Sequence, residues 1–380
     1  MRDADADWVI ESHNGCMPRL TTWVIPLPLV LSAILSACAT TTTTDEVLRP
    51  AEVDFELLDT ELEAWADQAP GGAVGLVRLA DGRTHLIDVG EDATTGAPLS
   101  IDDRVRVGSI SKVYTATLVL QLVDDGLVEL DEPVNTYIPD ASVNEAITVR
   151  HVLAHQSGLP NYTEEVELIG PSIEVPTLQF DPETIVSFVS DEEDFSPGAQ
   201  FSYSNTNFIV AGQLVEAVTG RPLEDVFAER ISTPLGLTDT SFDGGDVEGV
   251  VSGYSLALAE GSSGSRDYQS IAQLAWTAGS LVTTIEELAI FFDALLVEDQ
   301  LLSPESLEEM LGEIPDGAPY GLGLAPGSDF GVGHDGSIFG FNSEAQVDPA
   351  TREMVLLVVN NDARRPSIAT ALITELTGIE

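Results

Sequence analysis

The chain has 380 residues, of which 64 are acidic and 15 are basic, so its formal net charge is −49. Nucleic-acid binding requires a basic face, which a chain this acidic can hardly form, and a hydrophobic fraction of 43% argues against disorder. The length suffices for one large or two fused domains. We interpret the acidic excess as a salt-adapted surface; an acidic binding surface and an excess of no special meaning are the alternatives.

The N-terminal segment predicts a targeting signal. Arg19 precedes a mostly apolar stretch from Trp23 to Ala37, which is short for a membrane-spanning helix and is interrupted by two prolines. The stretch ends in LSAC, which matches the bacterial lipobox and places the lipidated cysteine at Cys38. We therefore expect an extracytoplasmic lipoprotein, anchored to a membrane of the cell envelope through lipid on Cys38. An uncleaved signal anchor is the alternative.

Three segments are expected along the chain. Residues 1–38 form the signal, and residues 1–16 within it are interpreted as lying upstream of the true start, or simply as disordered. Residues 39–51 form a threonine-rich tether, and residues 52–380 form the folded domain. Within that domain we expect an α/β part at about 52–108 and 316–380, and a helical part at about 109–315.

The secondary structure expected in the folded domain changes twice along the chain. Residues 52–69 have apolar positions at helical spacing, and the segment after them reads as two strands joined by the Asp81-Gly82 turn. The long middle is mostly helical, with Gly126, Gly158 and Gly220 at the expected helix ends. Strands return late, in YGLGLAP, FGVGHDG, FNSEAQVDP and EMVLLVVNND, and a final helix follows.

This order predicts an α+β fold. An antiparallel sheet is assembled from both ends of the chain and flanked by helices, and a helical subdomain is inserted between its halves. Such a fold creates a groove at the junction of its two parts, where helix N-termini meet a sheet edge.

Metal and thiol chemistry are not expected. Cys16 and Cys38 are the two cysteines, and both precede the folded domain. His151 and His155 are spaced four residues apart, but no glutamate stands between them as in a zinc helix. We interpret both as histidines on a helix face and predict no metal and no cofactor.

One lysine, Lys112, stands among fourteen arginines. A lysine can lose its proton when it is buried and then act as a base, whereas an arginine cannot. Ser109 lies three residues earlier, on the same face of a helix, within reach of the amine. The spacing is weak evidence by itself, because a surface lysine at a helix start would look the same.

Two further motifs strengthen this interpretation. Tyr203 and Asn205 stand just before a predicted helix, where a phenol can transfer a proton and an amide can hold a peptide carbonyl. An ordinary helix cap and a core aromatic are the alternatives there. His334 and Gly336 open a late strand, and a glycine lets substrate backbone lie close to the strand edge.

Together these motifs resemble those of the penicillin-recognising serine hydrolases. Ser109-x-x-Lys112, Tyr203-x-Asn205 and His334-x-Gly336 are similar to the branch that contains class C β-lactamases, D-alanyl-D-alanine carboxypeptidases, D-aminopeptidases and related esterases. The similarity covers about residues 55–380 and is greatest to the secreted carboxypeptidases. It implies that residues 52–380 are a serine hydrolase domain of β-lactamase/transpeptidase-like fold.

The resemblance also implies roles. Ser109 would attack a carbonyl and form an acyl-enzyme, while Lys112 and Tyr203 would share the proton transfers. Which of these two is the resting base stays open.

Substrate binding would involve four further residues. Backbone N–H groups of Ser109 and Ser337 would form an oxyanion hole. Asn205, His334, Gly336 and Ser337 would align the substrate, with His334 near the phenol of Tyr203.

One departure from the carboxypeptidase pattern concerns the terminal carboxylate of the substrate. A basic residue after YGLGL and a hydroxyl residue after the strand histidine hold that group in the carboxypeptidases; here these positions are Ala325 and Asp335. Because Asp335 would repel a carboxylate, we expect poor activity on free D-Ala termini and better activity on neutral or amine-bearing amides, esters or cross-linked peptides. Arg364 or Arg365 would supply the missing positive charge for the substrate carboxylate only if one of them reached the groove. We interpret both as surface residues.

The sequence therefore predicts an extracytoplasmic, lipid-anchored serine hydrolase. Its substrates would be small peptides, amides or esters, including D-amino-acid or cell-wall peptides, and its partners would include the membrane but no nucleic acid. A penicillin-binding sensor that is acylated without useful turnover is the alternative.

Overall fold

The computed structural model describes residues 53–139, 143–175, 177–189, 193–242, 249–255, 269–312, 320–327 and 330–379. Contacts divide the chain into a first unit, Met1–Pro50, and a second unit, Ala51–Glu380. The predicted signal, Cys38 and the tether lie outside the described residues. Within the described part, no helix is both long and apolar enough to cross a membrane.

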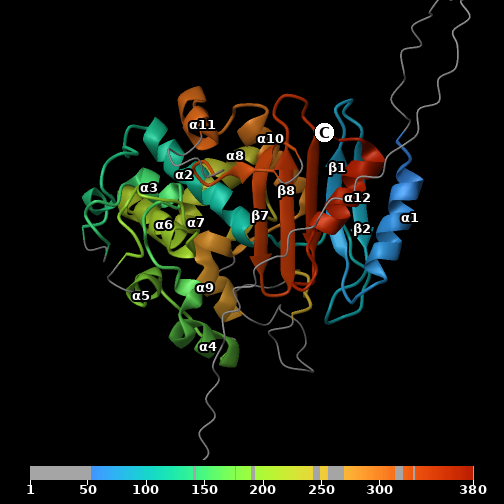
Figure 1. Ribbon diagram of the computed structural model, residues 1–380, viewed down its shortest axis with the longest axis horizontal. Helices are drawn as coiled ribbons and strands as arrows, with labels where there is room; N and C mark the ends of the chain where they lie inside the picture. The colour runs from blue at the N-terminus through green and yellow to red at the C-terminus, as the bar shows by residue number, and fades with distance from the viewer. Residues whose placement is uncertain are drawn as a thin grey trace, which may run out of the picture. The chain divides into compact units, whose positions relative to one another are not determined.

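An antiparallel sheet of six strands organises the second unit, in the order β2-β1-β9-β8-β7-β6. β1 and β2 come from the start of the domain and β6 to β9 from its end, so the sheet joins the two ends of the chain as expected (Figure 1). Its strands are β1 Ala73–Arg78, β2 Thr84–Val89, β6 Ala325–Pro326, β7 Val332–Ile338, β8 Phe341–Val347 and β9 Met354–Val359.

Helices cover the sheet and form the inserted region between its halves. The α-helices are α1 Phe55–Ala66, α2 Ser111–Asp124, α3 Val149–Leu153, α4 Val166–Glu174, α5 Pro182–Ser187, α6 Asn205–Thr219, α7 Leu223–Phe227, α8 Thr233–Leu235, α9 Gln269–Gly279, α10 Ile285–Leu296, α11 Pro304–Leu311 and α12 Ser367–Thr377. Short 3₁₀ turns are η1 Gly108–Ile110, η2 Val134–Thr136 and η3 Tyr162–Glu164, and a π-helical turn, η4 Ala228–Ser232, links α7 to α8.

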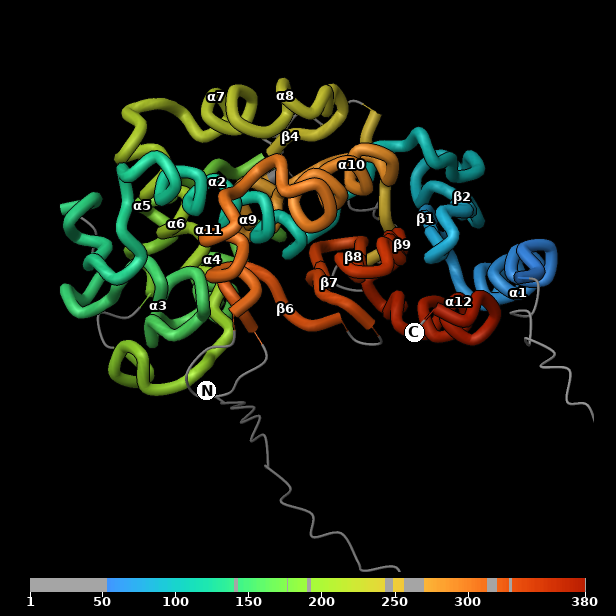
Figure 2. The backbone as a smooth tube through the Cα atoms, turned by 90° about the horizontal axis from the view of Figure 1, so that it is seen from above, coloured from blue at the N-terminus to red at the C-terminus, as the bar shows by residue number. Residues whose placement is uncertain are grey.

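Two apolar clusters hold the layers together. The smaller one joins α1 and α12 to one face of the sheet, with Leu58, Leu62, Val77, Val355 and Ile373 all buried. The larger one fills the other face and continues into the helical region around α2, α6 and α10. Figure 2 shows the resulting order, with α10 on one side of the sheet and α1 and α12 on the other.

The helical part is less uniform than expected. It contributes β4 Ser241–Phe242 and β5 Leu281–Thr283 to a three-stranded sheet, whose third strand, β3 Val105–Arg106, comes from the end of the first α/β segment. In addition, α10 packs against β1 and β9, so it belongs to the layer that covers the large sheet. The sequence did not indicate this, because a short buried strand and a helix buried against a sheet carry no periodicity of their own.

The expected elements around the late strands need correction. YGLGLAP forms a strand only at Ala325–Pro326. β7 begins at Val332, so His334 and Gly336 lie inside this strand and do not open it. Gly220 ends α6 in the left-handed conformation as predicted, but Gly158 lies in a loop beyond the end of α3, packed against the Phe195 carbonyl.

The charge of the chain leads to a prediction about its stability. Like charges repel one another in the compact state, and salt shortens the range of that repulsion from about 10 Å at 0.1 M to about 3 Å at 1 M. We expect the thermal unfolding midpoint to rise steadily as KCl increases from 0.05 to 0.5 M. Differential scanning calorimetry, with sucrose of equal osmolality as the uncharged control, measures this. A midpoint that stays constant in KCl would contradict the salt-adapted surface.

Candidate active site

Ser109 lies in the turn η1, at the start of α2 and between the two parts of the fold. This turn packs against β7, β8 and α9. Gly108 has a φ of +51°, and a Cβ there would lie 2.7 Å from the backbone nitrogen of Ser337. A Cβ on Gly336 would lie 2.0 Å from the carbonyl oxygen of Val107. Glycine is therefore required at both positions for close packing of the turn on β7.

This packing brings the backbone of Ser337 close to Gly108, the residue before Ser109. The backbone N–H groups of Ser109 and Ser337 therefore belong to segments in contact. Paired N–H groups of this kind are suited to stabilise a negatively charged oxygen.

Lys112 reaches Ser109 as its spacing predicts. Its Nζ lies 2.9 Å from Ser109 Oγ, 2.8 Å from Asn205 Oδ1 and 2.6 Å from the carbonyl oxygen of Ala278. The side chain is fully buried, and the Nζ also lies 5.0 Å from the centre of the Tyr203 ring. Burial holds the pKa of the Lys112 amine well below its ordinary value of 10.5.

The three partners of Lys112 explain how a neutral amine is accommodated. Asn205 Oδ1 and the Ala278 carbonyl oxygen can only accept hydrogen bonds, so they take both hydrogens of an uncharged amine. The remaining lone pair then faces Ser109 and can accept its hydroxyl hydrogen. In this state the amine is arranged to deprotonate Ser109.

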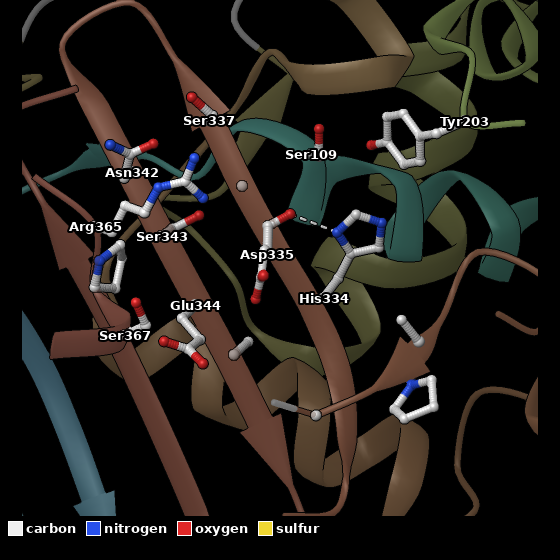
Figure 3. Close-up of a pocket in the computed structure, with 16 residues that line it drawn as sticks. Ser109, Tyr203, His334, Asp335, Ser337, Asn342, Ser343, Glu344, Arg365 and Ser367 are labelled. Atoms are coloured by element: carbon white, nitrogen blue, oxygen red, sulfur yellow. Dashed lines mark hydrogen bonds between the residues drawn. The ribbon is translucent and has the colours of Figure 1, made fainter. Parts of the chain in front are cut away.

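Tyr203 lies on the other side of Ser109, and Figure 3 shows its hydroxyl directed toward the serine. The ring is 37% exposed at the pocket wall. Burial of the hydroxyl raises the pKa of Tyr203 above its usual value, and a hydrogen bond with Ser109 acts in the opposite direction. The phenol is therefore protonated at rest.

Asn205 begins α6 and is held by a residue that the sequence did not single out. Asn161 Oδ1 accepts hydrogen bonds from the backbone nitrogen of Asn205, at 3.0 Å, and from its Nδ2, at 3.2 Å. One hydrogen of this amide is thus already engaged, and Asn205 does not line the pocket described below.

His334 lies in β7 as a neutral imidazole. Its Nδ1 is hydrogen-bonded with the carbonyl oxygen of Asp335, which requires a hydrogen on Nδ1, so Nε2 accepts the hydroxyl of Tyr320 at 3.0 Å. Burial, and to a lesser degree the nearby Lys112, lowers the pKa of His334 to about 3. Among the side chains around Ser109, the amine of Lys112 is the group most easily switched between charged and neutral.

Tyr320 and His155 form an aromatic layer behind Tyr203. The His155 ring centre lies 4.2 Å from that of Tyr203 and 4.9 Å from that of Tyr320. His155 follows the end of α3 with a φ of 55°. The prediction that His151 and His155 share a helix face was therefore wrong. No group of residues in the described ranges could hold a metal ion.

A pocket of about 500 Å³ opens beside Ser109 and Tyr203, between β7, β8 and the start of α12 (Figure 3). The predicted residues His334, Gly336 and Ser337 line it, and so do Ala325 and Asp335. Trp276 lies elsewhere, at a second pocket with Phe180 and Glu216.

The two arginines near the C-terminus have different positions. Arg364 stacks on Trp65, with its guanidinium carbon 3.6 Å from the ring centre, and donates to the backbone carbonyl oxygens of α1 and the turn after it. Arg365 is exposed and lines the pocket, as Figure 3 shows. Arg365 is therefore a surface residue, as expected, and it also reaches the groove, which was the alternative.

Comparisons with known proteins agree with this geometry. Residues 57–376 match the Beta-lactamase family. A D-stereospecific amidohydrolase of a Streptomyces species has a similar structure, with a TM-score of 0.71 and 33% identity over 86% of this chain and 100% of that one. A D-amino acid amidase from Ochrobactrum anthropi SV3 gives a TM-score of 0.73 and 25% identity over 85% of this chain and 98% of that one.

Among curated sequences, a D-aminopeptidase of Cereibacter sphaeroides is 26% identical over 86% of this chain and 64% of its own length. The chain thus spans less than two thirds of the curated relatives that it matches first. The α+β fold and the family match agree with each other. The chain belongs to the Beta-lactamase family.

The charge states at the site predict the pH dependence of activity. Because the neutral amine of Lys112 is the active form, kcat/KM should rise with pH along one limb whose midpoint lies below 10.5. His334 titrates near pH 3 and adds no limb above pH 4. The profile of His334→Gln should therefore keep the same midpoint, whatever its absolute rate. Hydrolysis of a p-nitrophenyl ester between pH 5 and 10 measures both profiles, and a limb that disappears in His334→Gln would contradict the neutral imidazole.

Proposed function

We propose that this protein hydrolyses amide bonds of D-amino-acid derivatives through an acyl-enzyme on Ser109. The observation that carries the proposal is the contact of the Ser109 hydroxyl with a lysine amine whose pKa burial holds well below its ordinary value. The similarity to a D-stereospecific amidohydrolase and to D-aminopeptidases supports the substrate class.

In the proposed mechanism Lys112 is the base. It takes the Ser109 proton while Oγ forms a bond to the scissile carbonyl carbon, and the N–H groups of Ser109 and Ser337 stabilise the oxyanion. The proton then passes through the Tyr203 hydroxyl to the departing nitrogen as the carbon–nitrogen bond breaks. Water, deprotonated by the same pair, attacks the ester and releases the acid, and the proton returns to Ser109.

The charge of the pocket supports neutral or amine-bearing substrates. Asp335 and Glu344 both line it, and burial, together with Glu344, raises the pKa of Asp335. A substrate carboxylate placed beside Asp335 alone would be repelled, whereas an ammonium or a neutral amide would not. D-amino-acid amides and amine-bearing peptides therefore fit this wall better than a bare D-Ala terminus.

Turnover of amides tests this proposal. We expect the purified protein to release ammonia from D-alaninamide at least about tenfold faster than from L-alaninamide, a difference of about 1.4 kcal/mol in transition-state stabilisation. Ser109→Ala should abolish release, while Ser187→Ala, at an exposed helical position outside the pocket, should not change it.

Intact-mass measurements during the same reaction separate the hydrolase from the sensor. A hydrolase returns to its unmodified mass when the amide is consumed. A lasting stoichiometric adduct on Ser109, with no ammonia beyond one equivalent, would support the penicillin-binding sensor and contradict the proposed turnover.

We also propose that the protein is a lipoprotein anchored outside the cytoplasm through Cys38. The apolar stretch that ends in LSAC supports this. A Cys38→Ser variant should lose the mass of the lipid and move from the membrane fraction to the soluble fraction, because lipid rather than a spanning helix holds it. Mass spectrometry of the N-terminus measures both the lipid and the cleavage, with Cys16→Ser as the matched control. An uncleaved chain that stays in the membrane fraction in Cys38→Ser would support the signal anchor instead.

A further inference from the structure

The pocket beside Ser109 carries opposite charges on different walls. Asp335 of β7 and Glu344 of β8 are directly opposite each other in the strand register. Like charges at such a position destabilise an antiparallel pair. Arg365, in the loop before α12, faces the same space and lowers the pKa of Asp335, against the larger effect of burial. The pocket therefore combines acidic groups with one strong cation.

The two carboxylates differ in how far they are engaged. Glu344 is 3% exposed, and its oxygens accept hydrogen bonds from Gln346 Nε2 and, at 2.7 Å, from Thr370 Oγ1 of α12. Asp335 is exposed to the pocket, on the same face of β7 as Ser337. Asp335 is thus the carboxylate that a ligand can reach, and Glu344 adds negative potential from beneath.

The loop that carries Arg365 is held in place by neighbouring residues. Asn342 Nδ2 donates to the carbonyl oxygen of Arg364 at 2.9 Å and to that of Asp362 at 2.9 Å, which fixes the loop over β8. Arg364 is anchored to α1 through Trp65. Among the described residues, no hydrogen bond or ion pair engages the guanidinium of Arg365 itself, although the chain contains 64 acidic residues. The loop therefore presents a free cation to the pocket.

The position of Asp335 relative to Tyr203 indicates which part of the substrate lies here. The charge of Asp335 acts on the Tyr203 hydroxyl and raises its pKa. In the proposed mechanism that hydroxyl gives its proton to the departing nitrogen. Because Asp335 lines the same pocket as Ser109 and Tyr203, the wall that it forms lies on the side where the leaving group departs.

We propose that the pocket binds a leaving group that carries both an ammonium and a carboxylate, that is, a diamino acid joined through one of its amines. Asp335 binds the free ammonium and Arg365 the carboxylate, so a carboxylate is accepted only together with an ammonium. The inference rests on the proposed function and names its substrate class. It also changes the expectation drawn from the sequence, in which Asp335 would repel every carboxylate.

Four peptides with the same acyl group test the inference. In each, N-acetyl-D-alanine is joined to the α-amine of the leaving group. The leaving group D-lysine carries an ammonium and a carboxylate, D-lysine amide only the ammonium, D-alanine only the carboxylate, and D-alanine amide neither charge. Chromatography with mass detection of the released amine gives kcat/KM. We expect kcat/KM for the D-lysine peptide to exceed that for the D-alanine peptide at least about tenfold, since a charge-assisted hydrogen bond typically contributes that much or more.

Two variants assign the charges to their residues. Arg365→Gln should lower the rate for D-lysine about tenfold, toward that of D-lysine amide, and leave D-alanine amide within about twofold. Asp335→Asn should remove the advantage of D-lysine over D-alanine and increase the rate for D-alanine. Arg221→Gln, which removes one positive charge at a surface ion pair with Glu229, is the matched control and should change none of the four rates.

The outcomes separate the inference from the function on which it rests. If none of the four peptides is cleaved in a Ser109-dependent way although D-alaninamide is hydrolysed, the inference alone fails; if D-alaninamide is not hydrolysed either, the proposed function fails with it. If the peptides are cleaved but D-lysine has no advantage, or if Arg365→Gln slows all four equally, the hydrolase remains and the diamino-acid pocket is wrong.

Discussion

Burial of the Lys112 amine is the constraint on which the rest of the site depends. A charged ammonium in this position would be poorly solvated, and burial shifts it toward the neutral form. The carbonyl oxygens of Asn205 and Ala278 then hold both hydrogens and leave the lone pair for Ser109. This burial lowers the stability of the fold, because the unfolded chain binds a proton that the folded chain has lost. The free energy of unfolding therefore increases as the pH rises toward 10.5. Above that pH the amine is uncharged in both states, and burying it no longer costs stability.

The groups around Lys112 keep this balance by staying neutral. Tyr203 stays protonated because burial raises its pKa, and His334 stays uncharged because burial lowers its pKa to about 3. The carbonyl oxygen of Asp335 can only accept a hydrogen bond, so it fixes the hydrogen of His334 on Nδ1. No competing charge of either sign therefore stands in direct contact with the Lys112 amine, and its protonation follows from burial alone.

Sequence patterns singled out Ser109, Lys112, Tyr203 and Asn205 because each side chain has a characteristic chemical function. Each also lies within three residues of another member of its motif. The structure adds partners that leave no such trace. Ala278 contributes a backbone carbonyl, which any residue type would carry, and Asn161 acts through a contact with a helix start 44 residues away. Gly336 was identified as a site residue, and the structure adds a second constraint there, because a side chain would collide with the carbonyl oxygen of Val107. The sheet was predictable from both chain ends, whereas the short strands of the inserted region were not.

The stacking of Arg364 on Trp65 gives α1 a part in the pocket that its place in the chain does not suggest. The hydrogen bond from Arg364 to Ala66 joins residues 298 positions apart. Together with Asn342 it fixes the loop in which Arg365 faces the substrate. The smallest unit able to select a substrate must therefore begin at α1, before the first strand and more than 40 residues ahead of Ser109. A chain that began after α1 would lose the partners of Arg364 together with the helix that covers one face of the sheet, so the pocket wall and the fold depend on the same helix.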